Sequence, residues 1–234
     1  TSREVRSRPS SRVALLAQGD DGAGIKMGAS MRSIGLTGGI ASGKSTVSKT
    51  LADHGAALID ADLLGHRTYE PGSETFDQVV ECFGADLVGE DGQIDRKILG
   101  GKVFGEPDGM KKLTDIVWPG IRKLATEELQ RLASEGTEVA ILEAAVMIEA
   151  GWQDLVDEVW VVTVPPETAR ERLMERNGLS AEDADKRINS QLTNDERSKH
   201  ADVIISTDFS FDEVTNRVNE VWSALQERIA GGAR

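Results

Sequence analysis

The sequence has very little cysteine and no long apolar run. Its 234 residues include one cysteine, Cys82, which excludes an internal disulfide and any zinc site built from several cysteines. This cysteine usage and the lack of a signal peptide predict a cytosolic protein, with an association with mitochondria left open. No apolar run approaches the ~20 residues that span a bilayer, so no membrane span is expected. The neighbours Val79, Val80 and Phe83 predict that the Cys82 thiol is buried and unreactive.

Positive charge is also scarce. The net charge is −13, and residues 1–30 contribute +2 to it through five basic and three acidic side chains. The rest of the chain therefore carries −15. Because affinity for a nucleic-acid backbone comes from clustered Lys and Arg, we expect no nucleic-acid partner.

The composition is otherwise that of a globular protein, with 39% hydrophobic and 29% charged residues. The length suits one α/β domain with an insertion, or two small domains. Residues 1–30 mix Ser, Arg and Gly without helical or strand periodicity, so we expect a disordered lead-in or linker there, with a transit peptide as the less favoured alternative. The catalytic domain is expected at residues 31–234.

One motif indicates nucleotide binding. Gly38-x-x-x-x-Gly43-Lys44-Ser45 follows a short apolar run and precedes an apolar helical pattern. In a phosphate-binding loop, backbone N–H groups cradle a polyphosphate at a helix N-terminus, the lysine neutralises the β- and γ-phosphates, and the serine holds Mg²⁺. The alternative is a chance Gly/Ser-rich loop with a solvated lysine, which the strand–loop–helix order disfavours. The residues predicted to bind ATP here are Gly39, Ile40, Ala41, Ser42, Gly43, Lys44, Ser45 and Thr46.

Carboxylates follow two of the predicted strands. The second strand ends in Asp60-Ala61-Asp62, and such side chains lie at the rim of an open α/β sheet, where ligands bind. We assign Asp62 to catalysis, as acceptor of a hydroxyl proton, and Asp60 to Mg²⁺ or structural support. Capping of the following helix is the alternative role. Glu143, at the end of the third strand, lies near the metal or is an exposed strand end, and the sequence favours neither.

The remaining pattern predicts an α/β fold, namely a P-loop kinase core with a parallel sheet flanked by helices. Between the second and third strands, residues at about 66–135 form short helical stretches broken by turns. We interpret them as a helical substrate-binding insertion. The alternative is an insertion that has no role in binding. The predicted strands lie around Ile34 and Leu36 and at 56–59, 139–142, 158–164 and 202–205, and the last helix at 212–228.

Basic side chains are frequent after the fourth strand. At helical spacing among acidic residues they usually form a solvated face. Arg176 and Arg187, however, flank a turn at Asn177-Gly178, where many nucleoside-phosphate kinases carry a mobile lid. We therefore predict a helical lid at about 176–199 that brings these arginines to the transferring phosphoryl group and excludes water. The basic residues of this region are Arg170, Arg172, Arg176, Lys186, Arg187, Arg197 and Lys199.

Taken together, these motifs resemble the dephospho-CoA kinase family in order and spacing, over about residues 31–230. They are the phosphate loop with Leu36-Thr37 before it, Ile59-Asp60-Ala61-Asp62, Glu70-Pro71-Gly72, Phe83-Gly84, Asp91-Gly92, Arg176-Asn177-Gly178-Leu179, Arg187-x-x-x-Gln191 and Ala201-Asp202-Val203-Ile204.

The resemblance implies a specific reaction. It is transfer of the ATP γ-phosphoryl group to the ribose 3′-hydroxyl of dephospho-CoA, giving CoA and ADP, the last step of coenzyme A synthesis. The resemblance implies Asp62 as the base, Thr37 and Lys44 at the phosphates, and Arg176 in the lid. The helical insertion would then bind the acceptor.

Several positions depart from the common bacterial pattern. The usual His-Pro is Trp118-Pro119, the usual Pro-Leu-Leu-Phe-Glu is the stretch from Ala145 to Glu149, and the usual Asn after the last strand is Ser206. With Leu64-Gly65-His66-Arg67 and 149–153, these variants resemble the carboxyl-terminal kinase domain of the animal-type bifunctional CoA synthase. An adenylyltransferase domain would then lie upstream.

His66 and Arg67, on the helix that begins near Asp62, are further candidates for substrate binding. One interpretation is that they contact the acceptor's phosphates or pantetheine arm. The alternative is that they only pack against the protein or face solvent. We group them with Thr37, Asp62 and Arg187 as substrate-binding candidates. The rival functions are a kinase for another small metabolite on the same core, and a nucleotide-dependent switch. A guanine switch would normally carry Asn-Lys-x-Asp, which the sequence lacks.

Overall fold

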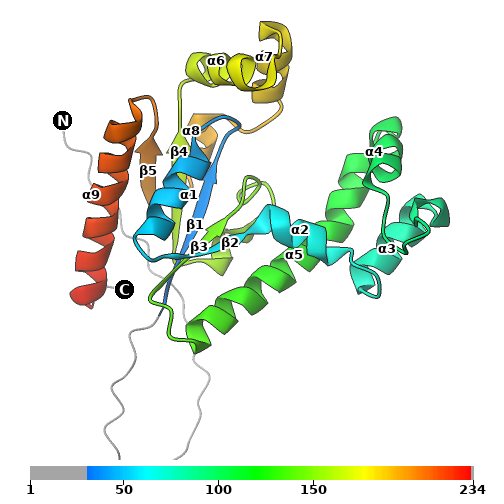
Figure 1. Cartoon of the computed structure of the whole chain (residues 1–234), viewed down its shortest axis with the longest axis horizontal. Coiled ribbons are helices and arrows are strands. Elements are labelled where there is room, and N and C mark those ends of the chain that lie inside the picture. Colours follow the sequence, from blue (N-terminus) through cyan, green and yellow to red (C-terminus); the bar gives the residue numbers. More distant parts are fainter. Residues whose placement is uncertain (1–30, 233–234) are drawn as a thin grey trace, which may run out of the picture.

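Five parallel strands form the centre of the protein, in the order β2-β3-β1-β4-β5 (Figure 1). The computed structural model describes residues 31–232, so the prediction made for residues 1–30 lies outside the described residues. Because all pairs are parallel, the carboxyl ends of the strands meet at one edge, as the sequence predicted. The strands are β1 (Arg32–Gly38), β2 (Ala57–Asp60), β3 (Val139–Glu143), β4 (Glu158–Thr163) and β5 (Val203–Ser206).

Helices α1 (Lys44–Asp53) and α9 (Phe211–Ala230) cover one face of the sheet. Alternate residues of each strand point to this face, which explains why Ile34 and Leu36 of β1 pack in the same cluster as Trp160 of β4. Both faces of the central strands are buried, and this accounts for the nearly continuous apolar runs.

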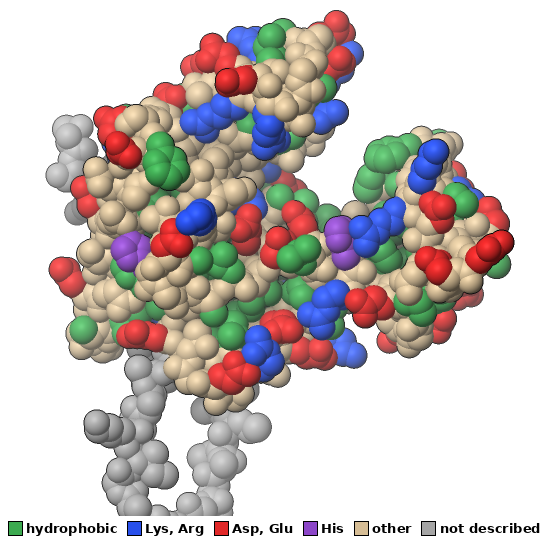
Figure 2. Space-filling view, viewed as in Figure 1, with side chains coloured by type: hydrophobic (Ala, Val, Ile, Leu, Met, Phe, Trp, Pro, Cys, Tyr) green, Lys and Arg blue, Asp and Glu red, His purple; other side chains and the backbone are tan. Residues whose placement is uncertain are grey.

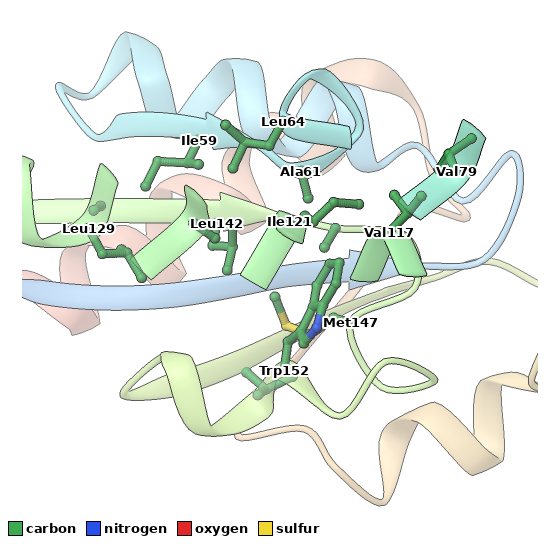
Figure 3. Packing of buried hydrophobic residues seen from close by; sticks show 14 of the residues in the cluster. Ile59, Ala61, Leu64, Val79, Val117, Ile121, Leu129, Leu142, Met147 and Trp152 are labelled. Carbon is green, nitrogen blue, oxygen red and sulfur yellow. The ribbon is translucent and has the colours of Figure 1, made fainter. Parts of the chain in front are cut away.

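The other face carries the helices of the predicted insertion. They are α2 (Ala61–Thr68), α3 (Glu74–Phe83), α4 (Arg96–Gly105) and α5 (Gly109–Ser134), with a short 3-10 turn η1 (Ala85–Leu87) between α3 and α4. A second 3-10 turn, η2 (Trp152–Leu155), belongs to the connection between β3 and β4 and packs in the same cluster as these helices. Figure 3 shows Val117 and Ile121 of α5 in the same cluster as Leu64 of α2 and Trp152 of η2. Helices α3 and α4 project away from the sheet beside one end of α5 (Figure 1). Within residues 31–232, no helix is long and apolar enough to cross a membrane.

Three helices follow β4, and the lid predicted at about 176–199 spans the end of the first and the whole of the other two. They are α6 (Pro166–Asn177), α7 (Ala181–Asn189) and α8 (Asn194–Ser198). Helix α6 ends at Gly178, whose φ of 64° is the left-handed conformation that favours glycine. Arg170 of α6 and Asp185 of α7 form an ion pair of 3.3 Å, which joins these two helices above the carboxyl edge of the sheet (Figure 1).

The prediction of a buried Cys82 was wrong, because the residue is exposed. The buried side of α3 runs through Thr75, Val79 and Phe83 at intervals of four residues. Cys82 falls beside this stripe, so its apolar neighbours in sequence do not enclose it.

Candidate active site

The phosphate loop connects β1 to α1 at the carboxyl edge of the sheet. A Cβ on Gly38 would lie 2.6 Å from the carbonyl oxygen of Val162, so the tight exit from β1 requires glycine. Gly43 precedes α1 with a φ of 82°, and even Ala41 is held at a positive φ of 57°. Helix α1 begins without a side-chain cap and without an acidic residue in its first turn. Its first N–H groups are thus free of a side-chain acceptor and can receive an anion.

Lys44 of this loop forms an ion pair with Glu143. Both side chains are largely buried, at 15% and 16% exposed. Glu143 is the register partner of Leu36 on β1 and of Asp60 on β2, so it stands in the middle of the carboxyl edge. The sequence left open whether Glu143 is an exposed strand end, and the structure turns its carboxylate toward Lys44.

Asp60 caps the helix that carries Asp62. Its Oδ1 accepts hydrogen bonds from the backbone N–H groups of Asp62 (2.8 Å) and Leu63 (3.2 Å). Asp62 lies exposed in the first turn of α2. Asp60 therefore has the structural role that the sequence allowed, and it fixes the turn from which Asp62 projects.

The other substrate-binding candidates have different surroundings. Thr37 is fully buried, and its hydroxyl donates to the carbonyl oxygen of Ala145 at 3.3 Å. His66 and Arg67 are exposed on α2, and Arg67 lies 3.4 Å from Glu128 of α5. Hydrogen bonds from Arg131, and secondarily from Arg67, hold the pKa of the Glu128 carboxyl below its ordinary value. The surface is hollowed between the lid helices and the projecting helices α3 and α4, and charged groups of both signs border the hollow (Figure 2).

The two lid arginines singled out from the sequence do not contact the phosphate loop in this structure. Arg176 is exposed in the last turn of α6, and its Nε donates to Oδ1 of the adjacent Asn177 at 3.0 Å. Arg187 is exposed on α7. Their roles therefore stay predictions.

Two other arginines of this region point inward, and for them the interpretation as a solvated face was wrong. Arg172 of α6 donates to the carbonyl oxygen of Ala41 at 3.2 Å and to that of Thr207 at 2.6 Å. The Thr207 hydroxyl in turn donates to the carbonyl oxygen of Ser42 at 2.6 Å. Arg172 and Thr207 thus hold the strained part of the loop, and no sequence signal distinguished Arg172 from its exposed neighbours.

Arg197 of α8 is 1% exposed. It bonds the carbonyl oxygen of Leu192, and its Nη2 lies 3.0 Å from Glu149. Nearby, the side-chain oxygen of Gln191 accepts a hydrogen bond of 2.8 Å from the backbone N–H of Ile40 in the phosphate loop. Gln191 was part of a family motif but carried no predicted role, and α8 is too short for periodicity to reveal that Arg197 faces inward.

Two of the departures from the bacterial pattern contact each other. Trp118 replaces the usual histidine within α5, and its ring lies edge-on to that of Trp152 with centroids 6.4 Å apart. Trp152 is buried, so the pair joins α5 to η2 in the core beneath the site.

Comparison with known proteins identifies the family. A family model described as dephospho-CoA kinase matches residues 32–213. The chain is similar to dephospho-CoA kinase of Symbiobacterium thermophilum, with 43% identity over 83% of this chain and 81% of that protein. It is similar to that of Geobacter sulfurreducens, with 44% identity over 82% of this chain and 98% of that protein.

A solved structure agrees with both. The dephospho-CoA kinase from Campylobacter jejuni superposes with a TM-score of 0.65 and 30% identity, covering 86% of this chain and 98% of that one. The chain therefore belongs to the dephospho-CoA kinase family, a family of ATP-dependent kinases that act in the last step of coenzyme A synthesis.

Proposed function

We propose that this protein transfers the γ-phosphoryl group of ATP to the ribose 3′-hydroxyl of dephospho-CoA. The observation that carries the proposal is the arrangement of the carboxyl edge. The phosphate loop lies on β1, and the helix that bears Asp62 follows β2, with Glu143 of β3 between them. Donor phosphate and acceptor hydroxyl thus have binding groups on the same edge of one sheet.

The donor side works by positioning and charge. The N–H groups at the start of α1 hold the β-phosphate of ATP, and Lys44 neutralises charge that develops on the leaving ADP. Lys44 is paired with Glu143. Its ammonium exchanges this carboxylate for the phosphates when ATP binds.

The acceptor side supplies the base. The 3′-oxygen attacks the γ-phosphorus in line, a new P–O bond forms as the bond to the bridging oxygen of ADP breaks, and the hydroxyl proton passes to the Asp62 carboxylate. The cap that Asp60 provides keeps the first turn of α2 in place, so that Asp62 points to the acceptor without an ordering step.

The donors at this edge suit Mg²⁺. The described residues hold no cluster of three His, Cys, Asp or Glu side chains that could bind a metal alone. Kinases usually bind Mg²⁺ through one or two carboxylates and the substrate phosphates, so no such cluster is needed. The Ser45 hydroxyl and Asp60, with Glu143 beside it, would hold the ion, which would neutralise charge on the phosphates.

The lid and the insertion complete the site. Arg176 and Arg187 reach the phosphoryl group when the lid closes over ATP, and closure excludes water as a competing acceptor. The hollow below the lid receives dephospho-CoA, with His66 and Arg67 of α2 near its phosphates and Thr37 behind the loop. The helices α2 to α5 form the wall on the acceptor side.

The test is turnover by the purified protein with Mg-ATP, comparing dephospho-CoA with adenosine, AMP and shikimate. We expect ADP release with dephospho-CoA only, and CoA as the second product. Turnover with another acceptor alone would favour a different small-molecule kinase. ATP binding without turnover on any acceptor would favour the switch.

The departures at Trp118 and Ser206 carry a narrower proposal. We propose that this chain is nearest to the kinase domain of the animal-type bifunctional CoA synthase, acts in the cytoplasm and follows an adenylyltransferase domain. The curated relatives compared above are bacterial and are named for the kinase alone. An antibody raised against this chain tests the fusion, since a cellular band near the 25.2 kDa of this sequence would contradict it.

A further inference from the structure

We propose that Arg197 and Gln191 are positioning residues that join the end of the lid to the phosphate loop and set the geometry in which ATP is held. The inference rests on the proposed kinase function, because it concerns the same loop. The two residues lie on the segment that runs from α7 into α8, at the base of the lid (Figure 1).

Gln191 makes the direct connection. The Ile40 N–H donates to its side-chain oxygen at 2.8 Å, across 151 positions of sequence. A Cβ on Gly39 would lie 3.8 Å from the same oxygen, so Gln191 covers the Gly39–Ile40 peptide from the lid side. This hydrogen bond fixes the orientation of a peptide in the loop that holds the phosphates.

Arg197 fixes Gln191 by holding the residue after it. Its guanidinium donates to the carbonyl oxygen of Leu192 and, 3.0 Å away, to Glu149 in the connection between β3 and β4. A Cβ on Gly39 would lie 3.5 Å from Nη1. One side chain therefore bonds the lid segment and the β3–β4 connection, and it lies beside Gly39 of the phosphate loop.

The chemistry of this buried arginine favours positioning over stabilisation. Arg197 is 1% exposed, and its Nε has no hydrogen-bond partner among residues 31–232. An ion pair between a buried arginine and a carboxylate that is itself 25% exposed, with one donor unsatisfied, is a poor source of stability. What apolar side chains cannot reproduce is the simultaneous orientation of a carbonyl group and a carboxylate.

The location gives this contact a consequence for the lid. Helix α7 ends at Asn189, and Arg187 lies on its last turn, four residues before Gln191. Because Gln191 and Leu192 are held in place, the carboxyl end of α7 can move only as far as the short stretch between Asn189 and Gln191 allows. The anchor thus determines where Arg187 arrives when the lid closes.

The first experiment compares Gln191→Ala with wild type. Gln191 is half-buried, so the variant should fold with a nearly unchanged melting temperature. We expect about a tenfold loss in kcat/KM for ATP, because the Ile40 N–H loses its acceptor. A wild-type kcat/KM in a folded Gln191→Ala variant overturns the proposal.

The second experiment separates positioning from stability. Arg197→Met should lower both the melting temperature and kcat, the latter about 100-fold through misplacement of the loop. In the double variant Arg197→Met/Glu149→Leu, the partly exposed carboxylate that lost its partner is removed as well, so the melting temperature should rise toward that of wild type while kcat stays low. Recovery of kcat together with the melting temperature overturns the proposal, since the pair would then be merely structural.

A matched control and a binding assay complete the design. Arg228→Met removes another ion pair, the one with the largely buried Glu158 at 2.9 Å. Glu158 begins β4 and so lies at the opposite end of this strand from the site. This variant should leave kcat unchanged. Binding of Mg-ATP, measured by calorimetry, should weaken in Gln191→Ala even if wild type phosphorylates no acceptor. Failure of the kinase function and failure of the anchor are therefore distinguishable.

Discussion

Among the arginines of α6 to α8, two pairs have opposite surroundings. Arg172 bonds the carbonyl oxygen of Ala41 in the phosphate loop and Arg197 bonds that of Leu192, so both point inward, whereas Arg176 and Arg187 point into solvent. All four lie on α6 to α8 among acidic residues. The inward pair is engaged in these contacts, whereas the outward pair is the one that we propose moves onto the phosphates.

Replacement of the proposed base should give the largest loss of kcat, with which the losses in variants of the two arginine pairs can be compared. Asp62→Asn keeps the shape of the side chain and removes its ability to accept the hydroxyl proton. We expect kcat to fall about 1,000-fold while KM for ATP changes little. Steady-state kinetics would check this, and equal turnover by the variant would remove Asp62 from the base role.

The variant Arg176→Ala tests the role proposed for the outward pair. Because Arg176 is exposed and, within residues 31–232, bonds only its neighbour Asn177, its loss should leave the unfolding free energy within about 0.5 kcal/mol of wild type. The loss of a cation at the phosphoryl group should lower kcat about 100-fold. Lys186→Ala is the matched control, since Lys186 is an exposed lid cation paired with Glu182 at 2.8 Å on its own helix. A similar loss in both variants would mean that any lid charge suffices.

The variant Arg172→Met tests the role of the inward pair. The variant leaves the carbonyl oxygens of Ala41 and Thr207 without their donor, which should reduce the unfolding free energy by about 2 kcal/mol. KM for ATP should rise more than kcat falls, because the loop is loosened before any chemistry. Urea unfolding beside kinetics tests this, and a variant as stable as Arg176→Ala would erase the distinction between the pairs.

The smallest expected effect concerns the helix that carries Arg197. Thr193 and Glu196 form a capping box at the start of α8. Thr193→Ala removes the side-chain half of the cap and should lower the unfolding free energy by about 1 kcal/mol. Ser210→Ala in the equivalent box of α9 is the control, and it should cost similar stability without any change in kcat/KM for ATP. Identical kinetics in the two variants would show that the start of α8 has no link to the loop.

The sequence predicted the sheet and the phosphate loop because both leave local signals. Buried parallel strands read as apolar runs, and the strands begin or end within about one residue of the predicted positions, as at 202–205 against Val203–Ser206. The phosphate loop needs glycine at Gly38 and Gly43 for reasons of backbone geometry, so its spacing identifies it.

The contacts that hold the loop could not be predicted in the same way. Gln191 and Ile40 meet across 151 positions, and Arg172 reaches Ala41 across 131. Helical spacing shows which residues share a face of a helix, but it does not show that the basic side of α6 packs on a distant loop. The prediction that Cys82 is buried was wrong for the same reason, because the exposure of this residue depends on which side of α3 packs against α5.

The most direct measurement is the position of the new phosphate in the product made from Mg-ATP and dephospho-CoA. Phosphorus NMR and mass spectrometry of that product should show one new phosphomonoester on the ribose 3′-hydroxyl, with one ADP formed for each CoA. A phosphate on another hydroxyl, or ADP released without a new ester, would contradict the assignment of this site to 3′-phosphoryl transfer.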